Sequence, residues 1–585
     1  MTKKLLAVLL ALVMCIGLVA ACGGDAPAPT PAPPPPPPPV TPQTPDATPE
    51  PPPPEHLDVL REAYGLDEDL RFIEQRSIVV LTWDRAPEGS AFHATDNAFT
   101  DWIKEQMLEL HNVVVTFDYV GRWQEVDELT MMMRERQAPD VCYTFNYGVI
   151  DEFGRQDMVV NLQPYLDASN DLFPNLWALL GYTNLYWNQD QETGRVWSIL
   201  GTQAFLQRFV PFIREDWLNT LNMPLPTTLQ EFEAALIAFR DNAELLLGAD
   251  AAQMTPLHMT QDIGWVAGPM IESFIPNDIT DKDFYITDVG APRHFFRPSS
   301  KEAIRVLNRW YHEGLIHPDF ALFGQGNETP DNFIRSGFVG ALAGHSWDQP
   351  YRGGGDGWTG RMHELVGPEA NFIAIDTFKN DAGEYRKYLG GSTDRNLFIP
   401  ATTTEPVAAL LYWDFLSRPE TIQFLQTGWE GINYLVTPDG AWANQVVDNQ
   451  LPQFMQSGMN YDLTMPINGL KLMDTELTVK TRALGYAGVE GRLIAQSFAV
   501  QTNGVRAIPL NMGTLTSEEG MADTIRERSQ AAWALAIVAA PADFDSVYDR
   551  EMQVLLNEFA QASMNERTQL WEARYGTETM LPTGD

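Results

Sequence analysis

Short apolar runs alternate with amphipathic segments in the first part of the chain. Residues 77–83 form a continuous apolar run, which is typical of a strand buried on both faces. Further strands are expected over 113–119 and 140–145, with a helix over 125–135 between them. Between the first two strands, one helical stripe carries the apolar side chains of Phe99, Trp102, Ile103, Met107 and Leu110. This β-α-β-α-β order predicts an α/β fold with a mostly parallel, doubly wound sheet.

Polar residues that cap a first turn indicate where several helices begin. We expect Asp96 or Thr95 to cap the helix that follows the first strand. Two patterns of Thr or Ser followed three residues later by Glu, at 228–231 and 299–302, are capping boxes ahead of apolar helical stripes. The C-terminal stretch over about 521–575 also has the pattern of helices.

The first residues have the pattern of an exported lipoprotein. Residues 1–21 combine two lysines with a short apolar stretch, which indicates a signal peptide and is too short for a comfortable membrane span. The small residues before Cys22 resemble a bacterial lipobox, so Cys22 is the expected lipidation site. Residues 22–54 are rich in Pro, Ala and Thr and predict an extended linker without a core. The protein is therefore expected outside the cytoplasm, anchored to the cell membrane by its N-terminal lipid.

Charge and cysteine content exclude some classes of function. The formal net charge is −39, and such a surface repels phosphate backbones, so nucleic acid is excluded as a natural partner. Cys142 is the one cysteine beyond the signal peptide and Cys22, so no intramolecular disulfide is expected. Its apolar neighbours indicate a buried small side chain.

Several segments together resemble the extracellular solute-binding lipoproteins of carbohydrate ABC importers (family 1 type, large lipoprotein subgroup). The resemblance covers most of residues 75–575. It is carried by the order and spacing of five segments: Arg136–Asp140, Arg214–Leu221, Pro226–Phe239, Leu307–Phe320 and Gly428–Gly440.

The resemblance implies a type 2 periplasmic-binding-protein-like fold, in which two discontinuous α/β lobes joined by a hinge close over a ligand cleft. The solute-binding body is expected over 55–585. Its first lobe is expected over roughly 75–190 plus part of 345–405, and its second over roughly 200–340 plus helices within 405–585. The family delivers mono- or oligosaccharides to the permease subunits of an ABC importer. A non-enzymatic monomer without a cofactor is expected.

Aromatic residues near strand ends and loops are the candidates for sugar binding. Pyranose faces stack on tryptophan while nearby Asp, Asn, Gln and Arg bond the hydroxyls, and the chain has 16 Trp. In doubly wound sheets ligands lie at the carboxyl ends of the strands. The candidate ligand-binding residues are Trp83, Asp84, Asn146, Trp197, Gln203, Trp265, Trp347, Asp348, Asp394, Arg395, Trp429 and Glu430.

A metal site and an enzymatic function are the alternatives to this interpretation. Relatives often carry an acidic loop that resembles a calcium site, but residues 240–256 lack clustered oxygen ligands, so no metal is expected there. His312 and His317 are five residues apart, which does not fit a helical zinc motif. Carboxylate pairs for a surface glycoside hydrolase or lyase stay open, because their separation is a three-dimensional fact. A peptide-binding protein of the same fold also stays open.

Overall fold

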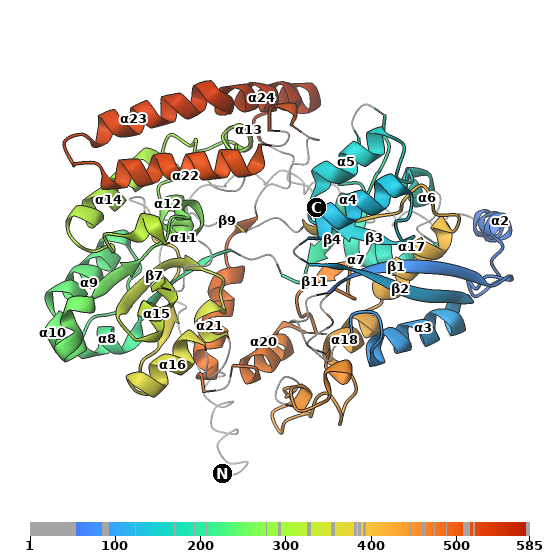
Figure 1. The fold of residues 1–585 in the computed structure, drawn as a ribbon, viewed down its shortest axis with the longest axis horizontal. Coiled ribbons are helices and arrows are strands. Elements are labelled where there is room, and N and C mark those ends of the chain that lie inside the picture. Colours follow the sequence, from blue (N-terminus) through green and yellow to red (C-terminus); the bar gives the residue numbers. More distant parts are fainter. Residues whose placement is uncertain are drawn as a thin grey trace, which may run out of the picture. The chain divides into compact units, whose positions relative to one another are not determined.

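The computed structural model describes residues 54–580 apart from short internal stretches, of which 85–92 and 507–514 are the longest. Residues 1–53, with the predicted signal peptide, Cys22 and nearly all of the linker, lie outside the described residues. Residues 54–585 form one compact unit (Figure 1). Within the described part of the chain, no helix combines the length and apolar character needed to cross a bilayer.

The first sheet begins with the predicted parallel strands. Strands β1 (Arg76–Asp84) and β2 (Val113–Gly121) pair in parallel along their whole length, joined by helix α3 (Ala98–His111). After helix α4 (Glu125–Glu135), strand β3 (Cys142–Thr144) runs beside β1 through a parallel bridge between Val80 and Val141. The predicted β-α-β-α-β order is therefore confirmed.

Segments from much later in the chain complete this sheet. Strand β10 (Thr393–Phe398) is antiparallel to both β3 and β4 (Ile199–Gln203). The two-residue strand β11 (Ile467–Asn468) then pairs in parallel with β4. Helix α17 (Pro406–Leu416) packs against this sheet and is buried at every residue from Val407 to Leu416, which explains why its sequence is apolar on all sides.

The second sheet has the strand order β6-β7-β5-β8. Strands β6 (Thr255–His258) and β7 (Val339–His345) are parallel, whereas β5 (Val210–Arg214) is antiparallel to β7 and to β8 (Phe372–Ala374). Helix α14 (Ser300–His312) buries its apolar stripe in the core of this sheet. The stripe itself is the predicted one, but its neighbours were not predictable from local pattern.

Helices make up much of the remaining body. Helix α2 (Pro54–Tyr64) precedes β1, and those between the strands are α5 (Tyr147–Arg155), α6 (Gln163–Asp167), α7 (Pro174–Leu185), α8 (Glu215–Thr220), α9 (Leu229–Asp241), α10 (Ala243–Leu247), α11 (Ile263–Val266), α12 (Gly268–Glu272), α13 (Asp281–Ile286), α15 (Thr329–Arg335) and α16 (Trp358–Leu365). Those after α17 are α18 (Pro419–Thr427), α20 (Thr475–Leu484), α21 (Gly491–Thr502), α22 (Ala522–Val538), α23 (Phe544–Leu555) and α24 (Gln561–Tyr575). The helical pattern expected over 521–575 is confirmed, and a π-helix (Leu556–Ala560) joins α23 to α24.

Two hydrophobic cores divide the chain: residues 397–399 join the first core, as part of the expected 345–405, and residues 407–425 join it as well. The first core draws on residues 66–199, 397–425 and 463–465, and the second on 210–378 and 493–560. Residues 345–378 therefore pack with the second core, because β8 pairs with β5. Residues 397–416 pack with the first core, because β10 pairs with β3 and β4. We take these two cores as the lobes.

The predicted capping box at Thr228 is confirmed and the one at Ser299 is not, and backbone geometry explains the difference. Thr228 accepts from the backbone of Glu231 and the Glu231 carboxylate accepts in return, so this capping box is confirmed. Helix α3 is capped by Asn97, one residue after the predicted Asp96. Ser299 has helical backbone angles, φ −65° and ψ −21°, and makes no capping bond, because a cap needs an extended backbone to aim its hydroxyl at the first turn.

A buried carboxylate holds the start of helix α7 from another part of the chain. Asp414 of α17 is 3% exposed and accepts from the backbone N–H groups of Asn175 and Leu176 at 2.7 and 2.9 Å. Its second oxygen accepts from the Asn175 side chain at 2.8 Å. These bonds satisfy orphan donors of the first helical turn.

We expect Asp414→Ala to lower the free energy of unfolding by about 3 kcal/mol, because it leaves buried N–H groups without partners. Chemical denaturation followed by circular dichroism measures the change. Glu420→Ala, which removes an exposed carboxylate from the first turn of α18, is the matched control. A loss no larger than that of the control would show that Asp414 does not carry this role.

Candidate functional site

The carboxyl ends of β1, β2 and β3 gather an aromatic cluster with two guanidinium groups, which we call the first-lobe site. Trp83, near the end of β1, is 2% exposed and packs on Tyr143 and Phe145, with ring centroids 4.2 and 5.1 Å away. Arg122, just after β2, lies 4.5 Å over the Trp83 ring and 4.8 Å over Phe145. Such cation–π contacts hold a guanidinium in place while its polar edge stays able to bond.

Arg395 forms the buried base of the first-lobe site. It is 1% exposed and lies 5.9 Å from the Trp83 ring. Its guanidinium is 3.5 Å from the Asp462 carboxylate and donates to the Thr464 carbonyl at 3.3 Å. A buried charge needs such partners, because its desolvation is otherwise costly. The contacts therefore tie strand β10 to the segment that precedes β11.

A buried acid stands beside this cluster. Glu125, the first residue of α4, is 5% exposed and accepts from the Thr144 hydroxyl at 3.1 Å. Burial raises the pKa of Glu125, and the hydrogen bond from Thr144 and the charge of Arg122 oppose that rise. The Glu125 carboxyl group therefore ionises less readily than the carboxyl group of an exposed glutamate.

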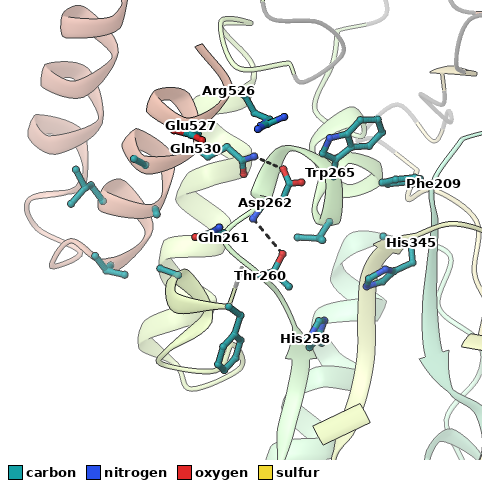
Figure 2. A pocket seen from close by; sticks show the side chains of 18 of the residues that line it. Phe209, His258, Thr260, Gln261, Asp262, Trp265, His345, Arg526, Glu527 and Gln530 are labelled. Carbon is teal, nitrogen blue, oxygen red and sulfur yellow. Dashed lines mark hydrogen bonds between the residues drawn. The ribbon is translucent and has the colours of Figure 1, made fainter. Parts of the chain in front are cut away.

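The second lobe holds a pocket of about 1210 Å³ at the carboxyl ends of β6 and β7, which we call the second-lobe pocket (Figure 2). Helix α22 forms one wall with Arg526, Glu527 and Gln530, and loops after β6 form another. Phe209 and Trp265 line it as a pair of rings with centroids 4.7 Å apart. The pocket thus combines apolar rings with a limited set of polar groups, as small-molecule sites do.

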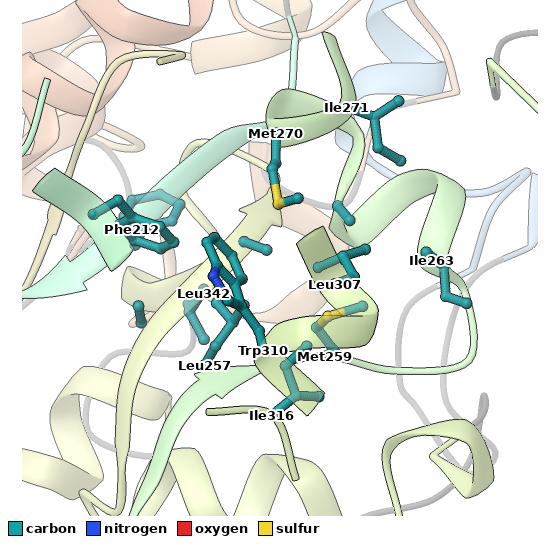
Figure 3. Close-up of a cluster of buried hydrophobic side chains, with 14 of the residues drawn as sticks. Phe212, Leu257, Met259, Ile263, Met270, Ile271, Leu307, Trp310, Ile316 and Leu342 are labelled. Atoms are coloured by element: carbon teal, nitrogen blue, oxygen red, sulfur yellow. The ribbon is translucent and has the colours of Figure 1, made fainter. Parts of the chain in front are cut away.

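Two histidines lie at the strand ends in this pocket. His258 ends β6 and His345 ends β7, with ring centroids 6.0 Å apart. Burial lowers the pKa of His258 to about 3 and that of His345 to about 4, so both imidazoles are neutral at pH 7. Both strands rest on the second core, where Leu257 and Leu342 lie beside Trp310 (Figure 3).

Close packing fixes the position of Trp265. A side chain at Gly344 of β7 would come within 2.8 Å of Pro269 and 3.1 Å of the Val266 carbonyl, so only glycine lets α11 and α12 lie this near the strand. Asp262, just before α11, accepts a hydrogen bond from the Gln530 side chain of α22. These contacts join α11 to the strand on one side and to α22 on the other.

Several of the predicted residues lie in or beside these two places. Trp83 and Arg395 belong to the first-lobe site, and the carbonyl of Asp84 accepts from the Arg122 N–H at 3.0 Å. Gln203 pairs with Asn468, whose side chain accepts from Arg395 at 3.4 Å. Two further predicted residues are Asn146, which is exposed at the start of α5, and Trp265 in the second-lobe pocket. Trp83 itself is covered, so it supports Arg122 and Phe145 and presents no open face.

Other predicted residues serve packing instead. Trp197 fills the space beside Gly154, where a side chain would come within 2.6 Å of its ring. Trp347 lies in the second core against Phe498, and Trp429 packs on Phe99 and Phe424.

Three further predicted ligand-binding residues lie elsewhere or cannot be placed by their side chains. Asp348 is 7% exposed, pairs with Arg352 at 2.7 Å and accepts from the Tyr486 hydroxyl at 2.9 Å. Glu430 is exposed in a loop that bridges to Tyr434. Asp394 belongs to strand β10, and its side chain lies outside the described residues.

Residues that the sequence analysis missed share one position. Arg122, His258 and His345 all stand at or just past the carboxyl end of a strand that has a parallel neighbour. His258 ends a strand of four residues that contains Pro256, so no apolar run in the sequence marks its position.

The histidines that might suggest a metal have other contacts. His312 lies 2.7 Å from the Ala539 carbonyl, and His317 packs on Phe323 and Phe333. Among the described residues, no three His, Cys, Asp or Glu side chains gather closely enough to hold a metal ion.

Comparison with solved structures identifies the class of fold: the chain has the periplasmic-binding-protein-like α/β fold of solute-binding proteins. The alginate-binding protein AlgQ2 is 16% identical with a TM-score of 0.57, over 86% of this chain and 100% of AlgQ2. An extracellular solute-binding protein from Bifidobacterium longum subsp. infantis is 15% identical with a TM-score of 0.59, over 86% of this chain and 99% of that one. FusA of S. pneumoniae, in complex with kestose, is 11% identical with a TM-score of 0.53, over 86% and 100%. No protein-family model and no curated protein sequence matches the chain.

The burial of Glu125 predicts a pH-dependent contribution to stability. Because the folded pKa lies above the usual 4.5, the fold favours the protonated acid. Its contribution is complete below the unfolded pKa and is lost as pH rises through the folded pKa. We expect Glu125→Gln to raise the melting temperature at pH 7, with a difference from the wild type that shrinks towards pH 4.

Differential scanning calorimetry across this pH range measures the effect. Asp127→Asn, which removes an exposed carboxylate from the same helical turn, controls for the loss of one negative charge. Destabilisation by Glu125→Gln of equal size at pH 4 and pH 7 would contradict the prediction.

Proposed function

We propose that this chain is the solute-binding component of an ABC importer and that it captures a neutral mono- or oligosaccharide. The observation that carries the proposal is the second-lobe pocket, where Trp265 and Phe209 stand beside hydrogen-bonding groups at the carboxyl ends of parallel strands. The fold supports binding of a saccharide, since proteins of this architecture include one named for alginate binding and one solved with kestose. The choice of a neutral saccharide rests on the charge of the pocket.

The aromatic rings fit the chemistry of a sugar. A pyranose has apolar C–H faces rimmed by hydroxyl groups, so it needs a flat apolar surface and several hydrogen-bonding partners at the edge. Trp265 is partly exposed and supplies the surface, while Thr260, Gln261 and Gln530 line the same pocket. In the first lobe, Arg122 and Asn146 stand at the corresponding strand ends.

Charge disfavours an anionic ligand in the second-lobe pocket. Its lining includes the carboxylates of Asp262, Asp331 and Glu527 and the guanidinium of Arg526. The whole chain carries a formal net charge of −39, which repels anions at longer range. Acidic sugars are therefore disfavoured at this pocket.

Closure of the lobes would follow from how the chain crosses between the two cores. It passes from the first core to the second between Ile199 and Val210, returns between Phe378 and Leu397, and crosses again between Met465 and Leu493. Few connections of this kind let two lobes rotate as bodies, and a ligand that contacts both lobes favours the closed form.

Delivery to permease subunits fits the predicted anchor. Lipidation at Cys22 and the linker over 22–54 would hold the body outside the cytoplasm and near the membrane. A tether replaces a bimolecular encounter with a local one at high effective concentration. A non-catalytic monomer suffices for this role.

We expect isothermal titration against neutral oligosaccharides of glucose, galactose, mannose and fructose to find a ligand that is recovered unchanged. Trp265→Ala should weaken its binding roughly tenfold, since it removes an aromatic surface from the pocket. Trp442→Ala is the matched control, because Trp442 is partly buried and stacks on Tyr434 outside both sites.

Two results would contradict the proposal. Binding of peptides with no response to any sugar would reassign the ligand. Cleavage of the bound sugar would favour a glycoside hydrolase or lyase.

A further inference from the structure

Three ring nitrogens of the two histidines in the second-lobe pocket lack hydrogen-bond partners among the described residues. His258 is 4% exposed, yet neither of its ring nitrogens has a hydrogen-bond partner among the described residues. The same holds for Nε2 of His345 within the described chain. Buried polar groups are nearly always paired, so unpaired ring nitrogens on two imidazoles that line a pocket point to a group supplied from outside (Figure 2).

The neutral state of the imidazoles restricts what that group can be. Burial lowers the pKa of both histidines far below neutrality. A neutral imidazole has one N–H donor and one acceptor nitrogen. A hydroxyl also donates and accepts, whereas a carboxylate only accepts and an ammonium only donates. Two imidazoles with centroids 6.0 Å apart therefore match neighbouring hydroxyls better than a charged group.

The surroundings favour the same chemistry. Trp265 and Phe209 line the pocket with aromatic surface on which a sugar ring can rest. His345 is held by an edge-on contact with Trp358, with centroids 5.3 Å apart, so its ring orientation is set by packing. The carboxylates of Asp262 and Glu527 in the same pocket disfavour an anionic group beside the imidazoles.

We infer that His258 and His345 bind two hydroxyl groups of one sugar unit and make the second-lobe pocket selective for neutral sugars over uronic acids. The inference rests on the proposed saccharide-binding function and adds the residues that determine selectivity. In this inference the two histidines recognise the hydroxyl groups of the ligand, and Trp265 supports its sugar ring.

The test measures the affinity of His345 variants for the neutral trisaccharide that binds the wild type most tightly in the titrations above. We expect His345→Phe to weaken that trisaccharide at least tenfold, and His345→Gln, which keeps a donor and an acceptor, to recover most of the affinity. Analogues with one hydroxyl replaced by hydrogen should bind the wild type more weakly, and one of them should lose nothing further in His345→Phe. His363→Phe is the matched control, since His363 of α16 bonds to Asn371 outside the pocket.

A second measurement uses the wild-type protein alone, so it does not depend on whether a variant folds. Long-range ¹H–¹⁵N spectra of the histidine rings report which nitrogen carries the proton and whether it is hydrogen-bonded. Saturation of the wild type with the same trisaccharide should shift the ring nitrogens of His258 and His345 and leave those of His363 in place.

The outcomes separate the two claims. If the wild type binds no saccharide, the proposed function fails and this inference fails with it. If the wild type binds the trisaccharide but His345→Phe binds it equally well, or the imidazole signals do not move, the inference alone is overturned. Equal weakening for every deoxy analogue in His345→Phe would mean a merely structural histidine and would also overturn it.

Discussion

Parallel pairing of strands is the constraint on which both candidate sites depend. Parallel neighbours must be joined by crossovers, and their carboxyl ends then meet at one edge of the sheet. In the first lobe this brings together the residues after β1, β2 and β3, so Trp83, Arg122 and Phe145 become neighbours. In the second lobe the same geometry brings His258 beside His345. Each lobe thus presents loops and side chains at this edge, and in the second lobe helix α22 adds a wall.

Buried polar groups distinguish these edges from the surrounding core. In the first lobe, Arg395 is satisfied by Asp462 and by backbone and side-chain acceptors, so its charge is tolerated under the aromatic cluster. In the second lobe, the imidazoles give up their charge because their surroundings cannot solvate it. The first arrangement stabilises a fixed scaffold, whereas the second leaves hydrogen-bonding capacity directed at the pocket. This difference is why we assign ligand selectivity to the second lobe.

Local pattern predicted the elements well and their partners poorly. The strand before Trp83, the helix over 125–135 and the box at Thr228 all follow from nearby residues, because periodicity and capping act within a few positions. The limits of the lobes do not follow, because β10 joins the first sheet after the whole second sheet has been built. Ser299 fails as a cap for a related reason, since its backbone is already helical where it joins α14.

The sequence by itself determined the α/β class, the order of the first strands, the acidic balance and the positions at which strands end. Only the tertiary structure decided which tryptophans are walls and which are core. Trp197 packs against Gly154 in the first core, whereas Trp265 belongs to α11, which Gly344 allows to lie close to β7 beside the pocket. Likewise His258 and His345 are far apart in the chain and meet only because β6 and β7 pair. Burial and strand pairing are set by contacts between distant segments, and these contacts leave no signal in the local pattern of residues.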